Sequence, residues 1–399
     1  MYRTSRYRLY PSKAQDRVLP DTLDTCRDLY NSLLHWRIHD CDRLGRAPTR
    51  FQQQAARPGW KKTHPELKRV HSQALQDVVH RADRAFQDFF RRIKAGEPAG
   101  HPKRRDKGYD SLTYTQSGFH LEDDRLCLSK IGAIKARLYR PLVGAVRTCT
   151  VRRVCGQWFV CIACQAEPVP LPPSEEEVGL DVGLTHFAAL STGEFIENSR
   201  FFRRAERSLA QTQRRVSRAR RGTRRQRTAK RAASRLNARV RDRRHDFAHQ
   251  TARRLVTCYG LIAVESLVIR NMVRNHCLAK SISDAAWSLF RLVLTWKAEK
   301  VGRSVVHVNP ANTSRRCSGC GLVAPKTLSD RRHQCACGLT LNRDTNAALN
   351  ILQDARRIVF SPLAPTALKG ATAHAPSSPS FALLPGLLLC CAPVRGCPA

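Results

Sequence analysis

The sequence is poor in acidic residues. Of its 399 residues, 32 are Asp or Glu and 70 are Lys or Arg, which gives a formal net charge of +38. This excess is more than solubility requires. It indicates a polyanionic partner, because lysine and arginine gain affinity by displacing counterions from phosphates. An anionic membrane is the competing interpretation.

Long hydrophobic runs are also lacking, which argues against a membrane-spanning chain. No uninterrupted apolar run approaches the roughly 20 residues of a spanning helix, and the run FALLPGLLLCC (381–391) is short and broken by Pro385. The opening MYRTSRYRLY alternates charged and aromatic residues, unlike a secretory signal. The 16 cysteines are therefore expected to be metal ligands or small core residues in a reducing cytoplasm.

The most informative segment is CSGCGLVAPKTLSDRRHQCACGLTLNRDTNAALN (317–350). Cys317 and Cys320 are spaced C-x2-C, and Cys335 and Cys337 form a second, tighter pair. Glycines beside both pairs allow knuckle turns, so the spacing predicts a closed structural zinc site with four thiolates. Such a site would shape the backbone just before Asp344, which becomes the first candidate for chemistry.

Hydrophobic periodicity divides the chain into two halves. The first half predicts a strand over 3–10, helices over 14–94 and strands over 109–166, with a hairpin turn at Gly156-Gln157. The proline-rich segment EPVPLPPSEEE (167–177) predicts a linker, since its prolines block helix and ladder bonding. The length suggests two or three domains.

The second half begins with VGLDVGLTHFAALSTGEFIE, which predicts three antiparallel strands with Asp181 in the first. An arginine-rich helical hairpin follows over 203–256, broken near Gly222. LIAVESL (261–267) reads as a buried parallel strand. A helix over 283–300, a strand over 304–310 and a final helix starting at Asp344 complete this half, and 358–399 is expected to be disordered.

Three acids stand at the ends of these elements: Asp181, Glu265 and Asp344. A buried charge needs a partner, and AVESL offers Glu265 none nearby in sequence. Three carboxylates at one sheet edge would suit Mg²⁺, and two such ions can promote phosphodiester cleavage. Each acid also has a simpler interpretation. Asp181 could cap a turn, Glu265 could pair with an arginine, and Asp344 could cap the final helix.

The motifs occur in an order that resembles the TnpB family. They are GLDVGLTHF, AVESL, NHCLAKSISDAAW, TSRRCSGCG and RDTNAALNIL, and YRLYPSKAQ and SLTYTQSGFHL resemble the family's amino-terminal half. TnpB proteins, also called OrfB, are transposon-encoded, RNA-guided DNA nucleases related to type V CRISPR effectors. Asn342 departs from the family pattern, which commonly has an acid there.

The resemblance implies a multidomain α+β fold. It implies a RuvC-like nuclease domain of RNase H type over 178–310 and 341–357, carrying an inserted zinc ribbon over 311–340. A β-barrel-like wedge domain would comprise 1–13 and 97–170, with a helical recognition lobe at 14–96 and a linker at 171–177. The implied catalytic and magnesium-binding acids are Asp181, Glu265 and Asp344, and the implied zinc ligands are Cys317, Cys320, Cys335 and Cys337.

The implied partners are a transposon-derived guide RNA and a target duplex beside a short adjacent motif, in a prokaryotic cytoplasm and at the nucleoid. The arginine run could be a solvated helix face, but its charge favours contact with a duplex backbone. We expect this contact from Arg214, Arg215, Arg218, Arg221, Arg224, Arg225, Lys230 and Arg231.

Two alternatives remain open. One is a RuvC-like nuclease that reads DNA shape without a guide, as a junction resolvase does. The other is a non-catalytic, guide-dependent DNA-binding regulator, which should lack one or more of the acids. The oligomeric state stays undetermined.

Cys161 and Cys164 also read C-x2-C, but residues three apart in a strand face opposite ways, so they are not expected to share an ion. His333 is treated as a loop residue that could replace one cysteine at zinc.

Overall fold

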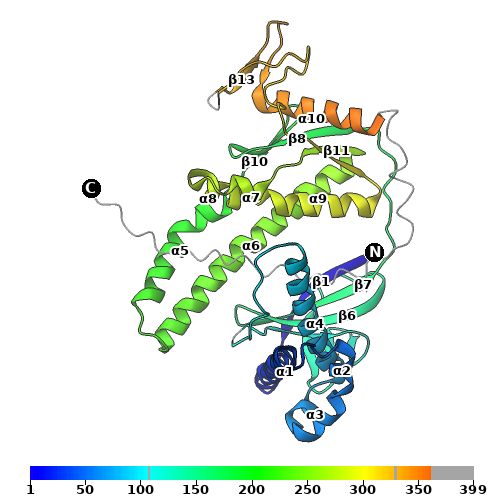
Figure 1. The fold of residues 1–399 in the computed structure, drawn as a ribbon. Helices are drawn as coiled ribbons and strands as arrows, with labels where there is room; N and C mark the ends of the chain where they lie inside the picture. The colour runs from blue at the N-terminus through cyan, green and yellow to red at the C-terminus, as the bar shows by residue number, and fades with distance from the viewer. Residues whose placement is uncertain (107, 328–329, 361–399) are drawn as a thin grey trace.

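The structure, a computed structural model, describes residues 1–106, 108–327 and 330–360 (Figure 1). The protein is a mixed α+β chain of several domains, with a seven-stranded sheet in its first half and a five-stranded sheet in its second. The predicted disordered tail begins at residue 358, but the last helix continues through Phe360. The remainder of that prediction, 361–399, lies outside the described residues.

The first sheet is antiparallel, and the earliest strand lies near its centre. Its order is β2-β6-β7-β1-β5-β4-β3. The strands are β1 (Tyr2–Tyr10), β2 (Ser111–Tyr114), β3 (Phe119–Glu122), β4 (Arg125–Leu128), β5 (Gly132–Arg137), β6 (Ala145–Val154) and β7 (Gln157–Gln165). The β6–β7 turn consists of Cys155 and Gly156, both with positive φ. It therefore lies one residue before its predicted place, because Gln157 already belongs to β7.

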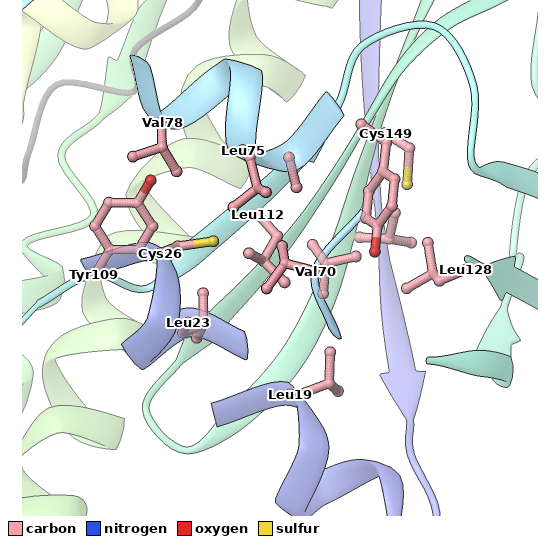
Figure 2. Packing of buried hydrophobic residues seen from close by; sticks show 14 of the residues in the cluster. Leu19, Leu23, Cys26, Val70, Leu75, Val78, Tyr109, Leu112, Leu128 and Cys149 are labelled. Carbon is pink, nitrogen blue, oxygen red and sulfur yellow. The ribbon is translucent and has the colours of Figure 1, made fainter. Parts of the chain in front are cut away.

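A group of helices separates β1 from β2 in the chain. These helices are α1 (Gln15–Leu44), α2 (Arg50–Ala55), α3 (Arg57–Thr63), the 3₁₀ helix η1 (Pro65–Arg69) and α4 (Ser72–Lys94). Their apolar stripes pack on one another and on the sheet. Leu19 and Leu23 of α1 and Leu75 of α4 join Leu112 and Leu128 of the strands in one core (Figure 2). The helical periodicity predicted for this segment is confirmed.

The second sheet has the order β10-β9-β8-β11-β12. Its strands are β8 (Glu177–Val182), β9 (His186–Leu190), β10 (Phe195–Glu197), β11 (Leu261–Glu265) and β12 (Ser304–Val308). The first three are antiparallel, and β11 runs parallel to both β8 and β12. These strand predictions are confirmed, although β8 already begins at Glu177, inside the predicted linker.

Helices cover both faces of this sheet. The helices of this half are α5 (Phe201–Arg218), α6 (Arg224–Cys258), α7 (Ile269–Met272), α8 (His276–Ala285), α9 (Trp287–Val301) and α10 (Arg343–Phe360). Helix α5 packs on α6 and α8 rather than on the sheet. In β11, Ile262 and Val264 join the core formed with α6 and α9, while Leu261 and Ala263 join the core formed with α10. A strand buried on both faces explains the nearly continuous apolar run in the sequence. Figure 1 shows α10 on one side of the sheet and α9 on the other.

The prediction that residues 283–300 are helical is confirmed except at Ala286, where the chain divides into two helices. Ala286 has φ 57°, in the left-handed region, so α8 ends there and α9 begins at Trp287. The predicted helical hairpin is confirmed as α5 and α6, with the break at residues 219–223. A two-stranded sheet of β13 (Arg332–Gln334) and β14 (Thr340–Asn342) lies between β12 and α10 in the chain.

Polar contacts join the two halves. Arg6 of β1 pairs with Asp242 of α6 at 3.6 Å, and the Cys155 thiol donates to the carbonyl of Ser234, also on α6, at 3.3 Å. Within the described residues, no helix combines the length and apolar character needed to span a bilayer.

Candidate functional site

The strand register places Asp181 and Glu265 side by side. Leu180 of β8 pairs with Val264 of the parallel strand β11, and the two acids are the next residues of their strands. Side chains alternate along a strand. Since Leu180 and Val264 both face α6 and α9, both acids lie on the opposite face, which α10 covers.

Helix α10 brings the third acid to the same face. Asp344 is its second residue, and Asn342 caps the helix because its Oδ1 accepts the backbone N–H of Asp344 at 2.9 Å. Gly179 lets the helix approach β8 very closely. A Cβ at this position would lie 2.0 Å from the carbonyl oxygen of Ala348. The absent side chain thus allows the backbones of strand and helix to touch, and Asp344 lies near Asp181 as a result.

The three carboxylates form an electrostatically coupled group. Burial raises the pKa of Asp181 well above its ordinary value, the neighbouring Glu265 and Asp344 raise it further, and Arg343 opposes the shift. Burial also raises the pKa of Glu265, against a hydrogen bond from Thr313. Asp344 lies 3.4 Å from the guanidinium of Arg343. One arginine does not neutralise three acids, so negative charge remains uncompensated at this edge of the sheet, and carboxylate oxygens are ligands that Mg²⁺ prefers. The geometric ligand groups in the described part of the chain do not include the three acids, whose oxygen atoms do not all lie within 4.8 Å of one another.

A fourth acid of the same motifs has a different role. Asp284 is buried, and its carboxylate accepts the backbone N–H groups of Phe202 and Arg203 at the start of α5. It also pairs with Arg244 of α6 at 2.9 Å. Asp284 therefore ties α8 to the helical hairpin, and its charge is balanced within the fold. This balance separates it from the three acids at the sheet edge.

The four predicted cysteines converge on one point. Their sulfur atoms lie within 4.8 Å of one another, with Cys317 and Cys337 at 3.7 Å and Cys320 and Cys335 at 3.4 Å. A tetrahedral zinc ion with bonds of about 2.3 Å separates its sulfur ligands by roughly 3.8 Å. The arrangement fits a structural zinc ion, and the short C-x-C pair contributes both of its thiols.

Helix α10 also holds the first cysteine knuckle. Asn346 and Asn350 are fully buried. The Asn346 side chain accepts from the backbone of Ser318 at 3.0 Å and donates to the carbonyl of Arg316 at 2.8 Å. Asn350 donates to the carbonyls of Arg316 and Thr313 at 2.7 and 2.8 Å. The helix that carries Asp344 therefore also fixes the segment that leads into the cluster.

The predicted basic residues lie on the helical hairpin and the turn within it. All eight are exposed, and none of them forms an ion pair with an acid in the part of the chain that the structure describes; they are Arg214, Arg215, Arg218, Arg221, Arg224, Arg225, Lys230 and Arg231. Unneutralised positive charge on an exposed surface suits a polyanion.

Other metal-binding patterns in the sequence do not extend these sites. Cys161 and Cys164 face opposite sides of β7, as predicted, and the geometric ligand groups in the described part of the chain do not include them. His333 is buried, and the Lys326 ammonium contacts its Nδ1, while the ligand group holds the four cysteines alone. The exposed group of His120, Glu122 and Cys127 on the β3–β4 hairpin was not predicted.

Sequence reasoning missed two residues that shape the site, Gly179 and Thr313. A glycine within a strand is a known sign that another backbone approaches, so Gly179 could have been identified. The Thr313 hydroxyl lies 2.6 Å from a Glu265 oxygen. That contact joins positions 48 residues apart, and sequence spacing gives no sign of it.

Three family models match the chain. OrfB_IS605, described as "Probable transposase", matches 159–276, and the model of the Cas12f1-like TNB domain matches 287–351. A model described as "Helix-turn-helix domain" matches 1–43, where the structure has β1 followed by the single helix α1.

The chain is similar to curated proteins over most of its length. A Streptomyces pristinaespiralis protein named "Putative RNA-guided DNA endonuclease" is 36% identical over 360 residues, which cover 88% of each chain. InsQ of Escherichia coli K12, which carries the same description, is 31% identical over 72% of this chain and 75% of its own. A solved Cas12f1–sgRNA–target DNA complex has a similar fold, with TM-score 0.54 at 12% identity, covering 88% of this chain and 98% of the Cas12f1 chain.

Proposed function

Because the chain belongs to the OrfB_IS605 family, also called TnpB, we propose that it is a transposon-associated, RNA-guided DNA endonuclease. The observation that carries the chemistry is the convergence of Asp181, Glu265 and Asp344 on the face of the second sheet covered by α10. The inference that the chain uses a guide rests on the comparison with relatives, since both curated relatives are named as RNA-guided nucleases.

The domain assignment follows from the same premise. We assign 178–310 and 341–357 to a RuvC-like domain of RNase H type, and 311–340 to an inserted zinc ribbon. Three antiparallel strands followed by two parallel ones support the first assignment, with Asp181 next to the end of β8 and Glu265 at the end of β11. Residues 1–13 and 97–170 would be the wedge domain and 14–96 the recognition lobe, supported by the position of α1–α4 between β1 and β2.

The three acids would hold magnesium, which prefers carboxylate oxygen ligands. When bound, two such ions would supply an activated water and stabilise the oxygen that leaves the cleaved phosphodiester. The chain's own part is to hold the carboxylates together. The paired strands fix Asp181 and Glu265, and the start of α10 places Asp344, whose charge also gains from the positive end of that helix.

The distribution of positive charge supports two nucleic-acid partners. The α5–α6 hairpin presents exposed, unpaired arginines and could follow a duplex backbone. The first half is basic as well, with residues such as Arg3, Arg6 and Arg8 on β1. A guided nuclease must hold a folded RNA and a heteroduplex together, and a basic surface divided over both halves suits that task. Such a protein would act on DNA at the nucleoid, in the cytoplasm.

Identification of the RNA bound to the purified protein tests the proposal. We expect a discrete transposon-derived RNA that resists moderate salt. Its replacement with a guide of new sequence should redirect Mg²⁺-dependent cleavage to the complementary site, because base pairing reads the target. The matched control is the same protein with a guide whose targeting segment is scrambled, which should bind equally well and leave the target intact.

Two outcomes would favour the alternatives. Cleavage of the same site at the same rate by RNA-free protein would mean that the chain is a shape-reading nuclease without a guide. Guide-directed binding with no cleavage in Mg²⁺ or Mn²⁺ would make it a DNA-binding regulator despite its three acids.

A further inference from the structure

A threonine hydroxyl is buried against one of the three acids. Thr313 lies in the loop between β12 and the first cysteine knuckle, and it is 3% exposed. Its Oγ1 is 2.6 Å from Oε1 of Glu265. In the part of the chain that the structure describes, Thr313 is the only residue whose side chain hydrogen-bonds to the Glu265 carboxylate.

Local structure fixes the position of this hydroxyl. Threonine is branched at Cβ, which restricts its χ1 angle. The Oγ1 atom also lies 3.2 Å from the carbonyl oxygen of Pro310, three residues earlier. The carbonyl of Thr313 accepts from the Asn350 side chain at 2.8 Å, and Asn350 is fully buried in α10. The helix that begins with Asp344 therefore also anchors the residue that contacts Glu265.

The hydroxyl has one proton and two acceptors within reach. An ionised carboxylate is a stronger acceptor than a peptide carbonyl, so the proton is donated to Glu265 when that residue is charged. Donation to Oε1 restricts rotation of the carboxylate and leaves Oε2 available for a cation. This arrangement matches the general pattern in which an outer hydrogen bond orients a metal ligand.

We propose that Thr313 is a positioning residue for Glu265, which it orients toward a divalent cation shared with Asp181 and Asp344. The proposal rests on the proposed function, because that function makes Glu265 a metal ligand. A purely structural role is the alternative. In that role the hydroxyl would serve the loop through Pro310, and its contact with Glu265 would have no effect on metal binding.

Two substitutions separate these roles. Thr313→Val keeps the shape of the side chain and removes the hydroxyl, while Thr313→Ser keeps the hydroxyl. Mn²⁺ binding is measured by titration of the full chain, assembled with its guide RNA where one co-purifies, and the Mg²⁺ dependence of cleavage is measured beside it. Thr22→Val is the matched control. Thr22 is also buried, and its hydroxyl makes a single hydrogen bond, to the carbonyl of Val18 in α1.

We expect Thr313→Val to weaken Mn²⁺ binding and raise the Mg²⁺ concentration for half-maximal cleavage by roughly 10- to 100-fold, the usual cost of losing an outer hydrogen bond at a metal site. Thr313→Ser and Thr22→Val should stay close to wild type in both measurements. Zinc content and guide RNA binding should be the same in all four proteins.

Unchanged Mn²⁺ affinity in Thr313→Val would overturn the proposal. So would equal losses in Thr313→Ser and Thr313→Val, because the hydroxyl would then not be the cause. Failure of the proposed function gives a different result. Wild-type protein would then fail to cleave any guided target. The Mn²⁺ titration would still show whether Thr313→Val changes the affinity for the cation.

Discussion

The carboxylate group and the four-cysteine cluster are built in opposite ways. Asp181, Glu265 and Asp344 come from β8, β11 and α10, and a packed core on both faces of the sheet fixes those elements. The cysteines come from two short turns within 21 residues, beside the small sheet of β13 and β14. The core thus assembles the carboxylates despite their mutual repulsion. The ribbon has little core of its own, so a metal bound by the four cysteines would supply much of its structure.

The sharpest test of this difference is Asp181→Asn. We expect cleavage to fall by more than about 100-fold, since the loss of a direct ligand should exceed the 10- to 100-fold cost of disturbing an outer contact. Zinc content and nucleic-acid binding should be retained. Asp24→Asn, which changes an exposed acid of α1, is the control and should cleave normally. Near wild-type cleavage by Asp181→Asn would remove this residue from the site.

The same variant should be more stable than wild type without metal. Because the folded-state pKa of Asp181 is raised, the folded protein binds this proton more tightly than the unfolded chain does. Metal-free stability should therefore fall as pH rises from the ordinary aspartate range, near about 4, to the raised value. Asp181→Asn should reduce this loss of stability with rising pH, and thermal melts over pH without added Mg²⁺ measure it. Greater metal-free stability of wild type at neutral pH would contradict the argument.

Cys317→Ser should mainly lower zinc content and stability, and should lower cleavage only indirectly. Zinc binding at four-thiolate sites is worth about 10–16 kcal/mol and is coupled to folding of the loop, so loss of a ligand should release zinc and unfold the ribbon. Because Asn346 and Asn350 join this knuckle to α10, cleavage should fall as well, by roughly tenfold or more if the effect resembles loss of an outer contact. Elemental analysis and thermal melting measure both effects.

Cys277→Ser is the control for this experiment, since Cys277 is exposed and lies outside the cluster. Full zinc content in Cys317→Ser would show that another residue completes the site, and His333 would be the first to examine. Absence of zinc from folded, active wild-type protein would end the structural role that we assign to the metal.

Gly179→Ala tests whether the core assembles the carboxylates. The new methyl group would lie 2.0 Å from the Ala348 carbonyl oxygen and 3.0 Å from Cβ of Leu352, so α10 must move. We expect a loss of roughly 1–3 kcal/mol in stability, as for other overpacked cores, together with lower cleavage. Gly59→Ala is the control, because a Cβ there has no neighbour within 4 Å. Equal stability of the two variants would contradict the close approach.

The smallest expected effect comes from the basic hairpin, which lies outside both sites. Replacement of Arg224 and Arg225 by alanine should weaken binding to duplex DNA uniformly across sequences. It should also reduce the slope of log K against log salt by roughly 1–2, the value for one or two phosphate contacts. Arg254→Ala is the control, because Arg254 already pairs with Glu194. An unchanged slope would mean that the two arginines do not contact phosphates.

Local patterns predicted the parts of the fold that depend on neighbours in sequence. Strands β8, β9 and β11 follow from alternation and apolar runs, and the cysteine spacing was sufficient to group four thiols. The order of the motifs resembles that of the TnpB family, and the family membership is confirmed. The assignment of the three acids as catalytic residues stays a prediction, although the structure brings them together.

The missed features depend on tertiary structure. The break at Ala286 places an alanine in the left-handed region, which is sterically unfavourable for an L-residue other than glycine, so the local sequence gives no sign of it. Thr313 contacts Glu265 because Asn350 of α10 holds its loop, so three segments must be in place first. Neither feature has a signature within a short window of sequence.

Helix α6 also fixes the distance between its exposed arginine end and its buried end. Its first residues, Arg224 and Arg225, are exposed, while Ala248, Ala252 and Leu255 near its other end are buried in the core beside β11. At about 1.5 Å per residue, the two regions are separated by roughly 36 Å along one rigid axis. The length of α6 would thus set the distance between the proposed nucleic-acid contact at the arginines and the proposed cleavage at the three acids. Insertion of seven residues, close to two turns, would lengthen it by about 10 Å and keep the same side of the helix facing the nucleic acid.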